Sequence, residues 1–197
     1  MLPRVHLIRH GETEWSLLGR HTGRTDILLT SQGAAQARRL GERLRGIEFS
    51  WVLTSPRLRA RQTCELAGLG ASAAIEEQLA EWDYGQFEGL TTPEIRRQRP
   101  NWELFTDGAP GGESPAEIYA RACGVVQRLL PMEGNVAVFS HGHFLRVLAA
   151  AWIKLPVAEG KRLGLNTASL SILGFEHARS EEPVISLWNE TALPRPE

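Results

Sequence analysis

Short apolar runs that end in polar loops and lead into helical patterns are the feature of this chain that most restricts its fold. Such runs occupy residues 5–8, 51–54 and 136–139, and two more follow at 169–175 and 184–188. Runs of this length are typical of buried strands, and strands that alternate with helices form a largely parallel sheet covered on both faces. The pattern predicts an α/β fold, a three-layer α/β/α sandwich with a mostly parallel central sheet.

The helices expected between these strands carry their own start signals. Thr30 precedes an amphipathic pattern and is the expected N-cap of one helix, and Ser114 opens another with a capping box. Ser55 and Pro56 are expected to supply the N-cap and the first residue of a third helix. The almost wholly apolar stretch 144–153 predicts a buried helix.

Length and composition indicate one globular domain that spans residues 1–197. The chain has 42% hydrophobic and 23% charged residues, as ordinary globular proteins do. The segment 85–112 has weak periodicity and several prolines, and we expect it to form a lid. The formal net charge of −1 makes neither nucleic acid nor an anionic membrane the expected partner. Any anion site must therefore be local.

Cysteine usage and hydropathy bear on the compartment. Cys64 and Cys123 are the only cysteines, and no C-x-x-C spacing occurs, so reduced thiols are expected. The chain starts without a long apolar stretch, and charged residues interrupt every candidate membrane span. We therefore expect a cytoplasmic protein. The apolar stretch 169–175 would form a sheet edge that could pair in a homodimer.

The first candidate site follows the run 5–8, where Arg9, His10 and Gly11 stand at the end of the expected strand. Arginine offers a planar fork of donors that matches phosphate oxygens, neutral imidazole is a nucleophile, and glycine lets the backbone approach a ligand closely. The combination favours a phosphate site. Taken alone, His10 is equally well explained as a hydrogen-bonded loop residue.

A second group of cationic side chains follows the run 51–54. Arg57, Arg59 and Arg61 alternate at the start of the expected helix. Their spacing places Arg57 and Arg61 on one helix face and Arg59 roughly opposite, so at most one set can point at the His10 loop. A solvated basic face is the alternative.

A third group lies after the run 136–139, where His141 and His143 stand before the apolar helix. Backbone amides and the helix dipole favour an anion at such a position. Helix capping is the alternative role for either histidine.

Three carboxylates lie among aromatic residues and glycines in the segment 81–89. Burial of Glu81, Asp83 or Glu88 against an aromatic ring would raise its pKa and suit it to general acid catalysis. Composition does not choose among the three, and an ordinary acidic loop is the alternative.

In this order along the chain, the motifs resemble the histidine phosphatase superfamily, also called the phosphoglycerate mutase-like family. The resemblance spans the chain and is strongest at residues 7–15, 29–33, 55–63, 81–89 and 140–142. It implies hydrolysis of a small phosphorylated metabolite without a metal ion or a cofactor.

The resemblance also implies a role for each residue of the expected catalytic set. His10 would be the nucleophile and Glu81 the proton donor. Arg9, Arg59 and His141 would hold the phosphoryl oxygens. The two arginine charges are expected to lower the pKa of His10 from about 6.5 and keep the ring neutral and nucleophilic.

Further positions are similar to the branch of broad-specificity acid phosphatases and sugar bisphosphatases. The resemblance implies substrate contacts from Thr22 and Gly23, and we expect the same of Ser16, Gly142 and His143. Ser16 departs from the family pattern, because many relatives carry asparagine there, and its hydroxyl is expected to contribute less.

Cofactor-dependent phosphoglycerate mutases are the main alternative, since they are similar at Arg9, His10 and Gly11. They are usually longer and carry a basic, proline-rich loop before the final histidine motif, which is not found in this sequence. A shorter chain with a more open site would lose its phosphoryl group to water. A phosphatase is therefore favoured.

Two alternatives come from other classes of protein. A metal hydrolase would use His10, His141, His143 and Asp83, but neither a His-x-x-x-His helix nor an Asp-rich ligand set is present. A catalytically inactive protein that binds phosphorylated partners is disfavoured because the expected catalytic set is complete.

Overall fold

A central sheet with six strands organises the structure, a computed structural model that describes residues 2–191. The strands are β1 (Arg4–Arg9), β2 (Phe49–Thr54), β3 (Ala73–Ile75), β4 (Asn135–Ser140), β5 (Leu170–Phe175) and β6 (Pro183–Glu190). They lie in the order β3-β2-β4-β1-β5-β6. The pairings from β3 to β1 are parallel, and those of β5 with β1 and β6 are antiparallel. The expected mostly parallel sheet is confirmed, and β5 is the strand that runs against the others.

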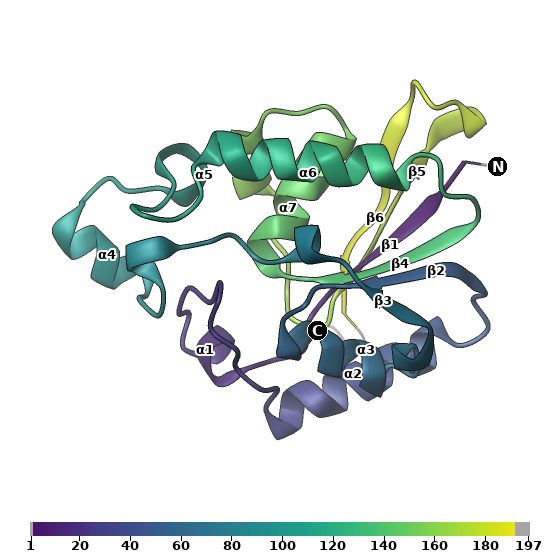
Figure 1. Cartoon of the computed structure of the whole chain (residues 1–197), viewed down its shortest axis with the longest axis horizontal. Coiled ribbons are helices and arrows are strands. Elements are labelled where there is room, and N and C mark those ends of the chain that lie inside the picture. Colours follow the sequence, from purple (N-terminus) through teal and green to yellow (C-terminus); the bar gives the residue numbers. More distant parts are fainter. Residues whose placement is uncertain (1, 192–197) are drawn as a thin grey trace, which may run out of the picture.

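Helices cover both faces of this sheet. They are α1 (Glu14–Leu17), α2 (Ser31–Leu44), α3 (Leu58–Leu66), α4 (Thr92–Gln98), α5 (Leu104–Asp107), α6 (Pro115–Leu129) and α7 (Gly142–Trp152). Figure 1 shows α6 and α7 on one side of the sheet and α2 and α3 on the other.

Alternation along β4 divides the core between the two faces. Val136 and Val138 pack into the cluster that contains the apolar residues of α6 and α7, whereas Ala137 and Phe139 pack into the cluster of α2 and α3. Successive residues of a strand point to opposite faces, so β4 is buried on both. The three-layer α/β/α arrangement is confirmed.

Most of the expected start signals are found where the sequence places them. The Thr30 side chain caps α2, and Ser114 forms the capping box of α6. The expectation for Ser55 and Pro56 is wrong, because α3 begins at Leu58 with Arg57 as an N-cap that makes no side-chain bond. Ser55 instead extends the strand pairing, its amide donating to the Phe139 carbonyl at 2.9 Å.

The stretch expected to form a sheet edge is also placed differently. It forms β5, which lies between β1 and β6, and β6 is the edge strand. The expectation of an edge at 169–175 is therefore wrong, because a further strand covers it. Homodimer formation stays a prediction.

The segment 85–112 contains α4 and α5 and extends away from the sheet, at the left of Figure 1. Its apolar residues Ile95, Trp102 and Phe105 are buried in the larger core cluster. The segment is thus anchored by packing, and its action as a lid stays a prediction. In the part of the chain that the structure describes, no helix is both long and apolar enough to cross a bilayer.

The parallel register brings three polar loops together. Arg9 at the end of β1 pairs with Ser140 at the end of β4, and Thr54 at the end of β2 pairs with Phe139. His10, Ser55 and His141 are the next residues along each strand. The carboxyl edge of the sheet therefore carries the candidate site, as is usual for α/β sheets.

Candidate active site

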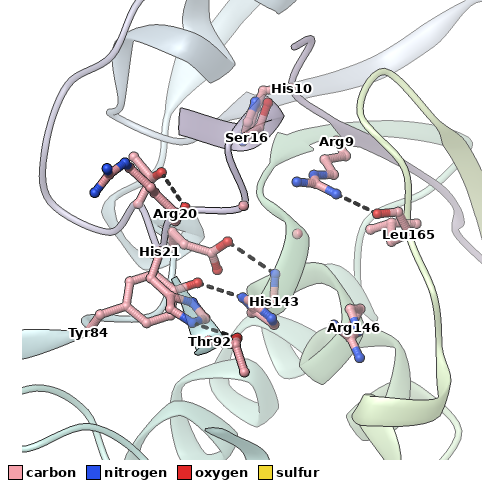
Figure 2. A pocket seen from close by; sticks show the side chains of 14 residues that line it. Arg9, His10, Ser16, Arg20, His21, Tyr84, Thr92, His143, Arg146 and Leu165 are labelled. Carbon is pink, nitrogen blue, oxygen red and sulfur yellow. Dashed lines mark hydrogen bonds between the residues drawn. The ribbon is translucent and has the colours of Figure 1, made fainter. Parts of the chain in front are cut away.

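A cavity of about 220 Å³ opens at this carboxyl edge (Figure 2). Arg9, His10 and Glu81 of the expected catalytic set line it. Arg59 and His141 are completely buried and lie behind the wall.

His10 is held in one orientation by the backbone. Its Nδ1 lies 2.7 Å from the carbonyl oxygen of Gly11. A carbonyl only accepts, so Nδ1 carries the hydrogen and Nε2 of the neutral ring keeps a free lone pair. Burial lowers the pKa of His10 well below its usual range, and the charges of Arg59 and Arg9 lower it further. The expected direction is confirmed, and burial is the largest cause.

Arg9 presents to the cavity a cation that has no direct carboxylate partner within residues 2–191. Its Nη1 donates to the Leu165 carbonyl at 2.5 Å, whereas its buried Nε has no hydrogen-bond partner among residues 2–191. No carboxylate of those residues lies within 4.0 Å of its guanidinium. A buried charge of this kind is costly unless an anion pairs with it, so Arg9 is suited to bind phosphate.

Gly142 allows Arg9 to lie against the first turn of α7. A Cβ atom added at Gly142 would lie 3.1 Å from Cζ of Arg9. Glycine at this position therefore lets the guanidinium and the amino end of the helix meet at the cavity wall.

Arg59 is the arginine of its helix that faces the candidate site. It is fully buried, whereas Arg57 and Arg61 are partly exposed. Its Nε donates to Nδ1 of His141 at 3.1 Å, and Nη2 donates to the Thr22 carbonyl at 2.8 Å. The guanidinium therefore connects the loop at 22–25 to the second histidine.

His141 has a defined tautomer because of these bonds. Its Nδ1 accepts from Arg59, so the hydrogen of the neutral ring lies on Nε2, which donates to Ser55 Oγ at 2.7 Å. Burial, followed by the nearby Arg59 charge, lowers the pKa of His141 well below its usual range. The ring centroids of His141 and His10 are 5.3 Å apart.

Glu81 caps α7 from outside the helix. Its carboxylate accepts from the amides of Phe144 at 2.8 Å and His143 at 3.1 Å. His141 occupies the N-cap position but makes no side-chain cap bond, so neither histidine has the capping role considered as its alternative. Asp83 instead pairs with Arg24 at 2.7 Å. Glu81 is thus the carboxylate of its segment that lines the cavity.

Arg121 of α6 supports the loop that carries Glu81, a role that no sequence motif indicates. Its guanidinium donates to the carbonyls of Gln78 and Ala80 at 2.8 Å and to that of Glu81 at 3.4 Å. It also pairs with Glu113 at 2.8 Å. These contacts connect residues far apart in the chain, so no local motif reveals them.

The expected substrate contacts divide into two groups. Ser16, Thr22, Gly142 and His143 line the cavity, and Gly23 does not. The Ser16 hydroxyl donates to the Thr13 carbonyl at 2.9 Å in the capping box of α1, so it has no hydrogen left for a ligand. The Gly23 amide donates to both carboxylate oxygens of Glu88 at 3.0 Å, so Gly23 stabilises the surrounding loop and does not contact the cavity.

Further residues lie on the cavity wall besides the expected site residues, namely Gly19, Arg20, His21, Tyr84, Thr92, Arg146 and Leu165. Burial raises the pKa of Tyr84, and its hydroxyl forms a hydrogen bond of 2.6 Å with Nδ1 of His143. Burial lowers the pKa of His21 to about 4. One signal was available in the sequence: Arg146 follows His143 by three residues, which places both on one helix face.

A metal centre of the kind considered above is not assembled. Within residues 2–191, no group of three or more His, Cys, Asp or Glu side chains is arranged to hold a metal ion.

The fold and this site define a class of protein, a phosphoryl-transfer enzyme with a neutral imidazole and unpaired guanidinium groups at the carboxyl edge of an α/β sheet. Residues 5–191 match the model of the histidine phosphatase superfamily (branch 1). An acid phosphatase of Mycobacterium tuberculosis is 45% identical over 197 residues, covering 98% of this chain and 95% of the relative. A sedoheptulose 1,7-bisphosphatase of Saccharomyces cerevisiae is 36% identical over 190 residues, covering 80% and 70%.

The fold is likewise similar to a solved structure. The protein of open reading frame Rv3214 from Mycobacterium tuberculosis superposes with a TM-score of 0.88 at 42% identity, covering 96% of this chain and 98% of that one. The chain belongs to the histidine phosphatase superfamily, and it is a phosphatase.

Proposed function

We propose that this chain hydrolyses small phosphate monoesters through a phosphohistidine at His10, without a metal ion. The observation that carries the proposal is the bond from His10 Nδ1 to the Gly11 carbonyl, which leaves Nε2 free beside a cavity that Arg9 and Glu81 also line. A neutral nucleophile, an unpaired cation and a carboxylate are the groups that phosphoryl transfer needs.

In the first half-reaction, Nε2 of His10 forms a bond to phosphorus while the bond from phosphorus to the ester oxygen breaks. The departing oxygen takes a proton from Glu81. Arg9 binds the phosphoryl oxygens with the donors that the protein leaves unpaired.

In the second half-reaction, water attacks the phosphohistidine and Glu81 accepts a proton from that water. The bond between phosphorus and Nε2 breaks, inorganic phosphate leaves, and His10 returns to its neutral form. Glu81 ends protonated, as it began. One carboxyl group therefore serves both steps.

Arg59 is proposed to act on the same phosphoryl group from behind His10, whereas both ring nitrogens of His141 are bonded, to Arg59 and to Ser55, and keep no donor for a phosphoryl oxygen. Arg59 keeps hydrogen on Nη1 beyond the one that bonds the Thr25 carbonyl at 3.0 Å. Because both residues are completely buried and joined by a hydrogen bond, we also assign them the positioning of His10 and of the loop at 22–25.

The size of the cavity limits the substrate. About 220 Å³ accommodates a phosphate group and a small leaving group. Sugar phosphates and bisphosphates fit this description, and one relative is named for sedoheptulose 1,7-bisphosphate. We propose these as the substrate class of a broad-specificity acid phosphatase. The free thiols of Cys64 and Cys123 favour the cytoplasm as its compartment.

The test is hydrolysis of p-nitrophenyl phosphate and a panel of sugar phosphates by the wild-type chain and by His10→Ala, with a chelator present. Turnover that persists in chelator and is lost in His10→Ala supports the proposal. Isomerisation of 3-phosphoglycerate in the presence of bisphosphoglycerate, faster than hydrolysis of any ester, would favour a mutase. Binding of phosphate without turnover of any ester would favour an inactive phospho-ligand-binding protein.

A further inference from the structure

A second cavity of about 280 Å³ adjoins the catalytic cavity, between the segment that contains α4 and α5 and residues of α7 and of the turn at 157–162. The two cavities share four wall residues, His21, Thr92, His143 and Arg146. The second is lined further by the aromatic rings of Trp102 and Phe105 and by Arg96, Glu103, Leu104 and Lys161. Arg146 therefore stands on the walls of both cavities.

Arg146 is held rigidly at this junction. Its Nε donates to the Gly160 carbonyl at 2.9 Å and its Nη2 to the Lys161 carbonyl at 2.7 Å. The guanidinium lies over the Phe105 ring, 4.6 Å from its centroid. Within residues 2–191, Nη1 makes no hydrogen bond, so its two donors remain for a ligand. Figure 2 shows this side chain next to His143 on the cavity wall.

The charges around the second cavity are unbalanced. Arg96, Arg146 and Lys161 are cationic, and Glu103 is the carboxylate on the same wall. Glu103 lies 3.6 Å from Lys161, and no carboxylate of residues 2–191 lies within 4.0 Å of the Arg146 guanidinium.

An uncompensated cation is costly in a partly buried place, and Arg9 is already the unpaired cation for the transferred phosphate. The aromatic walls lower the local dielectric and would strengthen an interaction of Arg146 with an anion.

We propose that Arg146 binds a second anionic group of the substrate, a carboxylate or a second phosphate on the leaving group. Lys161 and Arg96 add a favourable potential around that group. The inference rests on the proposed function and narrows its substrate class to esters with two anionic ends.

The experiment compares kcat/KM for matched pairs of esters that differ in the second anion. One pair is 3-phosphoglycerate and glycerol 1-phosphate, and the other is fructose 1,6-bisphosphate and fructose 6-phosphate. We expect the wild-type chain to prefer the ester with two anionic ends by about 10- to 100-fold, the range of a hydrogen bond to a charged group. The pair with the larger preference identifies the second anion as carboxylate or phosphate.

Arg146→Met should remove most of this preference, because methionine keeps an apolar stem over Phe105 but has no donors. If Arg146→Met lowers kcat/KM by the same factor for both esters of each pair, the inference is overturned, since Arg146 would then act on the transferred phosphate. Arg162→Met is the matched control, because Arg162 has an exposed side chain, pairs with Glu159 and lines neither cavity. It should keep the wild-type preference.

Two further measurements keep the inference testable if a variant or the proposed function fails. Lys161→Met should lower the preference less than Arg146→Met does, and an unchanged preference would count against the anionic subsite. If the wild-type chain hydrolyses no ester, the proposed function fails. Calorimetric measurement of the affinity for the same pairs of esters would then test the inference separately from the proposed function. Tighter binding of the ester with two anionic ends would support the inference, and equal binding would overturn it.

Discussion

The Nδ1 atom of His10 donates to the carbonyl oxygen of Gly11 at 2.7 Å. A carbonyl orients the ring as a carboxylate would, but it adds no full negative charge to raise the pKa of the histidine. Burial and the Arg59 and Arg9 charges therefore keep the pKa of His10 low. The neutral ring is the nucleophilic form that the proposed phosphohistidine requires.

The histidines of the core should make folding sensitive to acid. The pKa is lowered, mainly by burial, for His6, His10, His21, His141 and His143. As the pH falls below about 6.5, the unfolded chain binds protons that the folded chain does not, so the free energy of unfolding falls. For His21 the pKa of about 4 places this loss between pH 6.5 and pH 4, at about 3 kcal/mol. Urea denaturation at pH 7, 5.5 and 4 measures it.

His21→Gln isolates one part of this acid sensitivity. Glutamine retains a hydrogen-bonding group near Thr92 but does not titrate, so the variant should lose less stability than the wild type between pH 7 and pH 4. His177→Gln removes an exposed histidine. Between pH 7 and pH 4 its free energy of unfolding should fall by as much as that of the wild type. The same decline in His21→Gln as in the wild type would contradict the account.

Gly142→Ala should disturb the phosphate site through Arg9. The added Cβ would lie 3.1 Å from Cζ of Arg9, which is held on its other side by Leu165. A small displacement of the guanidinium should lower kcat/KM about 10- to 100-fold. Gly124→Ala is the control, because its Cβ meets nothing within 4 Å and it lies inside α6. That change should keep activity and raise stability by about 0.5–1 kcal/mol. Wild-type activity in Gly142→Ala would show that Arg9 does not need its close approach to residue 142.

Arg121→Met should lower kcat more than it raises KM. It removes the cation that holds the carbonyls on either side of Glu81 and leaves Glu113 partly buried without its partner. We expect a loss of about 2 kcal/mol in the free energy of unfolding, less than for a fully buried pair. Arg128 lies on the exposed face of the same helix, and Arg128→Met should change neither kcat nor the free energy of unfolding measurably. A rise in KM with kcat unchanged would place Arg121 in substrate binding instead.

Ser55→Ala tests whether Ser55 serves His141 rather than a helix start. The change leaves the buried Nε2–H of His141 without an acceptor, which costs about 1–3 kcal/mol, and activity should fall. Ser114→Ala removes the N-cap of α6 and should cost about 1 kcal/mol with activity retained. If Ser55→Ala loses stability but keeps full activity, Ser55 has a structural role alone.

The order of strands and helices was accessible from the sequence because each signal is local. Apolar runs predicted β1, β2 and β4, and the Thr30 and Ser114 signals predicted the starts of α2 and α6. The resemblance to the histidine phosphatases also predicted that His10 and His141 would serve one site. One or two short helices were expected within 85–112, but their bounds and the short strand β3 were not predicted, because packing against the rest of the chain decides them.

The finer features of the site depend on contacts between distant segments. Helical spacing separated Arg59 from Arg57 and Arg61, but only the fold shows that Arg59 is the buried one. The start of α3 was misplaced because Ser55 bonds His141 across the sheet edge. Arg121 of α6 contacts the distant segment 78–81, and neither composition nor spacing reveals such a role.

Trapping of the phosphorylated enzyme tests the central claim most directly. A substrate is mixed with the wild-type chain, the reaction is quenched within the first turnover, and the modified peptide is mapped by mass spectrometry. The account predicts a phosphoryl group on the peptide that contains His10, stable in base and lost in acid, and none in His10→Ala. A phosphoryl group on another residue, or full turnover by His10→Ala, would contradict it.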